Sequence, residues 1–97
     1  MVIAFSGWND AGEAATGAVS HLLSSWTDPS TDVVPELIAV VDPEDFYDFQ
    51  VNRPIVEVDD SSIRSLTWPC TQVFGLRTPD LKHDFVVVRG VEPSMRW

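Results

Sequence analysis

The residues with the most chemical potential lie near the start of the chain, in the stretch IAFSGWNDAGEAATG at 3–17. A loop with a glycine near each end carries a tryptophan, an amide and a carboxylate. The residues of this pattern are Gly7, Trp8, Asn9, Asp10 and Gly12. Such a loop can hold an anion on backbone amides, present side chains to a partner, or only turn the chain.

The loop lacks the side chains of a nucleotide-phosphate site. In G-x-x-x-x-G-K-[ST] a lysine and a hydroxyl follow the second glycine, whereas Glu13 and Ala14 stand there in this chain. A carboxylate at that point would repel a phosphate. The dinucleotide pattern G-x-G-x-x-G also fails, because Asn9 replaces its second glycine. A small anion or carboxylate, a protein partner contacted by Trp8, and a Trp8 folded back over the sheet all stay open.

Nucleophilic and metal chemistry has less support. Ser6 lacks the leading glycine of the G-x-S-x-G elbow. Cys70 is the single cysteine, and no histidine lies at a spacing from it that would indicate a catalytic cysteine–histidine pair. We therefore expect Cys70 to be a small core residue. Glu44, Asp45 and Asp48 share a face if their segment is helical, and we expect that face to be solvated instead of holding Mg²⁺. We therefore predict no catalytic residue, no metal and no cofactor.

The charge balance limits the partners. Fifteen acidic and six basic residues give a net charge of −9, which repels phosphate backbones and anionic lipid surfaces. No apolar run approaches the roughly 20 residues of a membrane span, and the first residues lack the basic part of a secretory signal. We expect a cytoplasmic protein that binds neither nucleic acid nor membranes.

Strands and one long helix must position the loop. Apolar and β-branched runs predict strands and a hairpin around the turn DDSS. The predicted strands are 2–5, 37–41, 55–58, 63–68, 71–76 and 85–88. Apolar residues at three- and four-residue steps predict a helix within 11–26, capped by Asn9 or Asp10. Asp42 and Pro43 predict a second, short helix. The stretches 27–35 and 77–83 are predicted as a linker and a turn.

The run FVVV at 85–88 is apolar at every position, which predicts a strand covered on both faces in a three-layer α/β sheet. One long helix cannot cover both faces, and Ser94 would cap a further helix. We therefore expect a single, partial α/β domain over 1–97 with its second helical layer incomplete. The chain would be an N-terminal fragment, or another subunit would shield its bare face.

Four stretches, in order, resemble the proteasome assembly chaperone family in its actinobacterial branch. They are FSGWNDAGEAATGAV, DPEDFYDFQVNRP, TWP and VVVRGVEPSMRW. The succession of an acidic-aromatic run, Arg-Pro, Trp-Pro and Arg-Gly-x-Glu-Pro makes the resemblance specific. The chain departs from the family in length, since such members are roughly two to three times longer on the scale of ordinary α/β domains. Its linker at 27–41 is also more extended.

The resemblance implies a phosphorylase/hydrolase-like fold without an established enzyme activity. It also implies a scaffold role, because relatives engage proteasome α-subunits and some recognise short C-terminal tails. Besides the loop, two further patches carry the family pattern: Asp48, Arg53 and Pro54, and Arg89, Gly90, Glu92 and Pro93.

We therefore predict a protein-binding assembly factor or adaptor that is a homo-oligomer. Its strand-end loops would bind proteasome subunits or the C-terminal tails of other proteins, with a carboxylate on the amides of Gly12 and its neighbours. The predicted binding residues are Gly7, Trp8, Asn9, Asp10 and Gly12, with a secondary patch of Asp48, Arg53, Arg89 and Glu92. The alternative is a small-molecule enzyme, a hydrolase or carboxylate-amine ligase, that uses Asn9, Asp10 and Glu92 in the same cleft.

Overall fold

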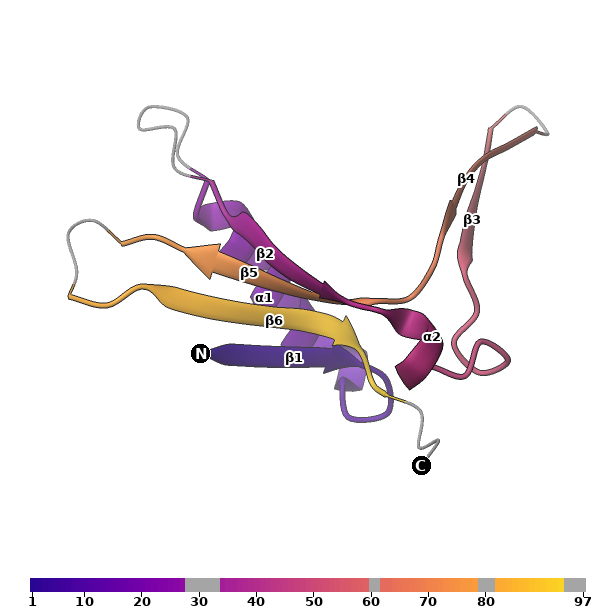
Figure 1. Cartoon of the computed structure of the whole chain (residues 1–97), viewed down its shortest axis with the longest axis horizontal. Coiled ribbons are helices and arrows are strands. Elements are labelled where there is room, and N and C mark those ends of the chain that lie inside the picture. Colours follow the sequence, from indigo (N-terminus) through magenta and orange to yellow (C-terminus); the bar gives the residue numbers. More distant parts are fainter. Residues whose placement is uncertain (28–33, 60–61, 79–81, 94–97) are drawn as a thin grey trace.

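A computed structural model describes residues 1–27, 34–59, 62–78 and 82–93. Within them lie a four-stranded sheet, a separate two-stranded hairpin and one long helix (Figure 1). The sheet has the order β1-β6-β5-β2, formed by β1 (Val2–Ser6), β6 (Phe85–Val91), β5 (Thr71–Leu76) and β2 (Glu36–Val41). The hairpin consists of β3 (Ile55–Asp59) and β4 (Ser62–Thr67). The predicted mixed α/β class and the predicted strands are confirmed, with ends that agree to within three residues.

Strand directions decide which loops meet. β6 pairs with β1 in parallel and with β5 antiparallel, and β2 pairs antiparallel with β5. Because parallel strands finish at the same end of a sheet, the segments that follow β1 and β6 lie together. Thr71, the first residue of β5, is at this end as well. We call it the loop end of the sheet.

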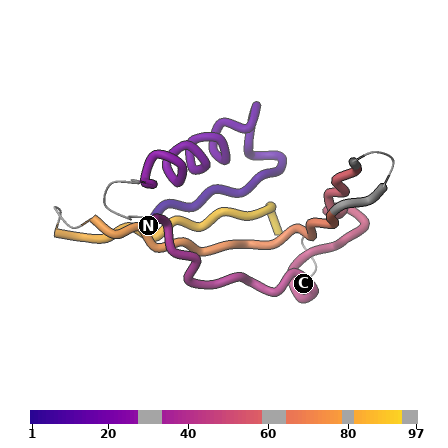
Figure 2. The backbone as a smooth tube through the Cα atoms, turned by 90° about the horizontal axis from the view of Figure 1, so that it is seen from above, coloured from indigo at the N-terminus to yellow at the C-terminus, as the bar shows by residue number. Residues whose placement is uncertain are grey.

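One face of the sheet is covered by α1 (Ala14–Ser25), which follows a 3₁₀ turn, η1 (Ala11–Glu13). The helix contacts β1 and β6, and Figure 2 shows it on one side of the strands. The residues buried between helix and sheet are Ala4, Val19, Leu23, Leu76 and Val87. These apolar side chains form the core of the described chain.

The opposite face of the sheet is largely open among the described residues. Ile3 and Val73 both pair with Val88, next to the buried Val87, so the three side chains point away from α1. Ile3 is 50% exposed, and Ile38 of β2 is 59% exposed. Among the described residues, the prediction that 85–88 is covered on both faces therefore holds on the α1 side only.

A short helix and a buried tyrosine fix the chain before the hairpin. In α2 (Pro43–Phe46) the carboxylate of Asp42 accepts a hydrogen bond from the Glu44 amide at 3.0 Å, which confirms the predicted cap. Tyr47 is buried, and its hydroxyl hydrogen-bonds the hydroxyl of Thr71. Neither Tyr47 nor Thr71 was predicted to have a role beyond its local element. Asp48 follows α2 and so does not share a helix face with Glu44, and no cluster of metal-binding side chains occurs in the described part of the chain.

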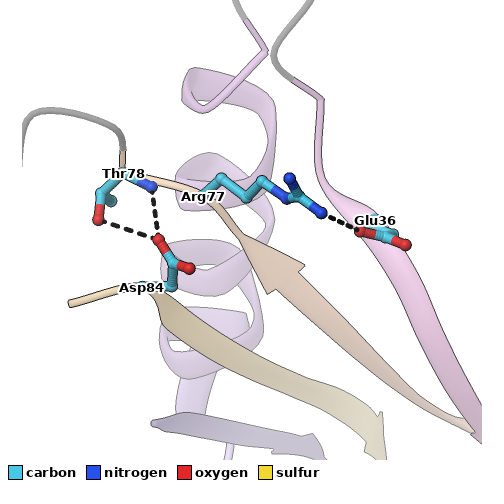
Figure 3. Close-up of polar contacts among 4 residues, drawn as sticks. All are labelled: Glu36, Arg77, Thr78 and Asp84. Carbon is cyan, nitrogen blue, oxygen red and sulfur yellow. Dashed lines mark hydrogen bonds and ion pairs between the residues drawn. The ribbon is translucent and has the colours of Figure 1, made fainter.

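At the other end of the sheet, polar contacts join neighbouring strands (Figure 3). Arg77 pairs with Glu36 across β5 and β2 at 3.9 Å, and the Thr78 amide donates to Asp84 at 2.9 Å. The indole of Trp26 packs edge-on against Phe85, with 5.7 Å between ring centroids, as expected for a packing residue.

Several sequence-based predictions fall on positions that the structure does not describe. They are most of the linker (28–33), part of the hairpin turn (60–61), part of the 77–83 turn (79–81), and Ser94 with the end of the chain (94–97). No helix in the described ranges is long and apolar enough to cross a bilayer.

The core prediction concerns Val87, whose side chain is fully buried. Val87→Ala should lower the free energy of unfolding by about 2 kcal/mol, because it removes buried methyl groups and leaves a cavity. Urea denaturation measures this change. The matched control is Val51→Ala, at a side chain that is 73% exposed, and it should change stability by less than about 0.5 kcal/mol. Equal effects of the two substitutions would contradict the core described above.

Candidate functional site

Backbone geometry favours glycine at two positions of the loop after β1. Gly7 and Gly12 have φ angles of 148° and 63°, in the region that favours glycine. At Gly7 there is a second constraint, because a Cβ atom would overlap the side chain of Glu92. The loop and the segment after β6 therefore approach each other as closely as a glycine allows.

Glu92 ties the loop to the end of β6. Its Oε2 accepts a hydrogen bond from the backbone amide of Trp8 at 3.1 Å, and its Oε1 accepts one from the side-chain amide of Asn9 at 3.1 Å. The amide of Glu92 donates to the carbonyl of Ser6 at 2.8 Å, which continues the β1–β6 pairing by one residue. One carboxylate thus holds two consecutive loop residues.

Asp10 caps the long helix from within the loop. Its Oδ1 accepts hydrogen bonds from the amides of Ala15 at 2.8 Å and Thr16 at 3.1 Å, and its Oδ2 accepts one from the Thr16 hydroxyl. The hydroxyl bond, with help from the two amides, holds the pKa of Asp10 below its ordinary value. The predicted cap is confirmed.

The same contacts bear on the expected anion site at the helix start. The amide of Glu13 donates to the carbonyl of Asp10 at 3.0 Å, and the amide of Ala14 donates to that of Ala11. Together with the side chain of Asp10, these bonds engage four consecutive amides, from residue 13 to residue 16. The helix start therefore already carries a carboxylate of its own chain.

Trp8 points away from the protein. Its side chain is 97% exposed, although its backbone amide is bonded to Glu92. The alternative in which Trp8 folds back over the sheet is therefore wrong. Beside it lies a hollow of about 310 Å³, the tryptophan hollow, lined by Ser6, Gly7, Trp8, Val51, Asn52, Glu92 and Pro93.

A second cavity opens between the sheet, α1 and the base of the hairpin. We call it the arginine pocket, since Arg53 and Arg89 both line it, and it encloses about 340 Å³. Its wall includes Thr16 of α1 and Trp68, whose ring packs edge-on against Phe49 with 4.9 Å between centroids.

Arg89 is half-buried in this pocket. Its Nη2 donates to Oε1 of Gln72, directly opposite on β5, at 3.1 Å, and its guanidinium lies over the ring of Phe74 at 5.6 Å. Cys70 also lines the pocket and is only half-buried, so the expectation of a core cysteine is wrong.

Comparison with known proteins places the chain in a family. A family model described as PAC2 family matches residues 4–97. The chain belongs to the PAC2 family.

Several solved structures are similar to this chain and share its fold. A proteasome-assembly chaperone homologue from Mycobacterium tuberculosis is 44% identical, with a TM-score of 0.81 over 98% of this chain and 37% of its own. A PAC2 family protein from Streptomyces avermitilis is 50% identical, with a TM-score of 0.77 over 100% of this chain and 38% of its own. A Corynebacterium glutamicum protein of unknown function is 27% identical, with a TM-score of 0.77 over 98% of this chain and 32% of its own.

The chain thus spans little more than a third of the length of the first two relatives. A comparison with curated proteins gave no significant match.

In this PAC2 chain the predicted site residues fall into three groups. The loop residues 7–12 lie with Glu92, whereas Arg53 and Arg89 share the arginine pocket. Asp48 lines neither of the two cavities just described and accepts a hydrogen bond from the Gln50 amide at 2.9 Å. Sequence reasoning missed Asn52, which lines both cavities. Its position just before Arg53 was the one available signal.

The hydrogen bonds of Asp10 predict a pH-dependent contribution to stability. A lowered folded-state pKa means that this contribution is present above the ordinary carboxyl pKa of about 4 and is lost as the pH falls through the lower folded value. Asp10→Asn should therefore be less stable than the parent above about pH 5, and the difference should shrink at lower pH. Urea denaturation across the pH range measures it.

The control for this prediction is Asp45→Asn, at an exposed aspartate of α2. It should show a much smaller difference from the parent over the same pH range. A stability difference for Asp10→Asn that stays constant from pH 7 down to below the ordinary carboxyl pKa would contradict the role of the charged carboxylate.

Proposed function

We propose that this PAC2-family chain is part of a protein-binding assembly factor that engages a segment of its partner at the loop end of the sheet. Membership of the PAC2 family supports a role as an assembly factor, and so does the similarity to a proteasome-assembly chaperone homologue. Proteasome subunits, and the C-terminal tails of such proteins, are the partners that we propose to test first.

The exposed indole of Trp8 carries this proposal. An indole offers a large, rigid apolar surface, and tryptophan is enriched among the residues that dominate binding energy in protein interfaces. The Glu92 carboxylate fixes the Trp8 amide, and the Asp10 amide donates to the Gly7 carbonyl at 3.1 Å. Because the backbone of the loop is already ordered, little conformational entropy has to be lost when the ring binds.

The enzyme alternative has weaker support from the geometry. Asn9 and Glu92 are hydrogen-bonded to each other, and Asp10 is bonded to the start of α1. The three polar groups that a hydrolase or ligase would use therefore hold the loop in shape. The homo-oligomer and the cytoplasmic location stay predictions from sequence.

Trp8→Ala should weaken partner binding by about 2 kcal/mol, the effect expected of a buried aromatic anchor. It should leave the melting temperature unchanged, because the side chain makes almost no contact with its own chain. Calorimetric titration of the intact protein with a proteasome α-subunit measures the first effect. The control is Phe46→Ala, at a half-exposed aromatic residue of α2, and unchanged affinity for Trp8→Ala would remove this ring from the interface.

The partner itself is tested by capture. The intact protein should retain proteasome α-subunits, and the Trp8→Ala variant should retain fewer at equal protein concentration. Repeating the capture with α-subunits that lack their C-terminal tails shows whether the tail is the bound segment. Complete absence of capture, together with a large thermal stabilisation by a nucleotide, would favour an enzyme and overturn the assembly-factor proposal.

A further inference from the structure

We propose that the arginine pocket binds a carboxylate that is attached to a short apolar group. This inference concerns a cavity other than the tryptophan hollow, and it does not depend on the role of Trp8. The carboxylate could belong to the end of a polypeptide or to a free organic acid, and the experiment below separates these two sources.

Charge is the first argument. Among the described residues, those that line the pocket include two arginines and no aspartate or glutamate, although acids outnumber bases fifteen to six in the whole chain. The pocket is therefore a local cationic site on an acidic protein. A ligand with one negative charge fits this arrangement better than a multiply charged phosphate, because long-range repulsion from the net charge of −9 grows with the charge of the ligand.

The state of the two guanidinium groups is the second argument. A guanidinium has five N–H donors in a planar fork that matches a carboxylate. At Arg89 one nitrogen is used by Gln72 and the plane is held over Phe74, so the group is positioned while other donors stay available. Arg53 is exposed and makes no hydrogen bond or ion pair with the described residues. Two such donors lining one cavity are suited to share a single anion.

The remaining wall defines the rest of the ligand. Ile55, Trp68, Pro69 and Val91 give the pocket a largely apolar lining, and Trp68 is held in place by Phe49. Ser6 and Thr16 also line it, and their hydroxyls donate to the Gly90 carbonyl and the Asp10 carboxylate. A cavity of about 340 Å³ is at the lower end of the range for small-molecule sites, which suits a ligand of a few carbon atoms beyond the carboxylate.

The test uses the intact protein and three probes in calorimetric titrations at low salt. One is a tetrapeptide with a leucine at its free C-terminus, the second is the same peptide with a C-terminal amide, and the third is hexanoate. If the site recognises a carboxylate, the free peptide or hexanoate should bind at least tenfold more tightly than the amide. If only the free-acid peptide binds, the natural ligand is the end of a polypeptide. If only hexanoate binds, the natural ligand is a free organic acid.

Variants then locate the binding. Arg53→Gln should weaken binding of the probe about tenfold. The side chain of Arg53 is exposed, so this substitution should leave the fold intact. Arg89→Lys keeps the charge but loses the planar fork, and it should also weaken binding. Arg77→Gln, at the other end of the sheet, is the matched control and should have no effect (Figure 3). Trp8→Ala should not change the affinity either, which separates this pocket from the proposed partner surface.

Two results would overturn the inference. One is equal affinity for the peptide acid and the peptide amide together with no binding of hexanoate, including the case in which no probe binds at all. The other is a carboxylate affinity that Arg53→Gln and Arg89→Lys both leave unchanged.

Discussion

The parallel pairing of β1 with β6 is the constraint on which the site depends. It pairs residues that are 85 positions apart, so that Glu92 reaches the backbone amide of Trp8. The requirement for glycine at position 7 follows from this pairing, because a side chain at Gly7 would occupy the space of the Glu92 carboxylate. The same pairing places Arg89 and Gly90 near the end of strand β6, beside the base of the hairpin. Without it, the loop, the hollow and the pocket would not share one end of the sheet.

The packing of the sheet explains why so much apolar surface meets solvent. α1 covers one face and buries Val87 completely, whereas Ile3 and Ile38 stay at least half exposed. The hairpin adds to this surface, since Val58 is 61% exposed, and a lone two-stranded hairpin is only marginally stable in water. In this fold the hairpin is anchored near its base, where Phe49 packs on Trp68 and Tyr47 bonds to the sheet. Its position, and with it one wall of the arginine pocket, depends on those aromatic contacts.

Local features of the fold could be predicted from the sequence, and features of pairing could not. The strands and the caps at Asp10 and Asp42 are set by neighbouring residues, so patterning found them. The contact between Glu92 and Trp8 depends on strand order, which one sequence does not display. Trp8 itself was ambiguous, because a strand-end tryptophan can either fold back or project. The half-buried Cys70 was misjudged for a related reason, since its surroundings come from the hairpin base and from β6.

The acidic residues and the basic residues have different uses at the loop end of the sheet. Asp10 and Glu92 accept hydrogen bonds from backbone amides nearby, as Asp48 does in the turn before the hairpin. Each of these carboxylates therefore has a structural partner in its own chain. Arg53 and Arg89 line a cavity and retain donors, and Trp8 projects a ring that almost nothing covers. What this end can offer a ligand is thus cationic and aromatic, even though the protein as a whole is strongly acidic. A partner selected by overall charge would be basic, whereas one selected by this surface would present an apolar side chain beside an anionic group.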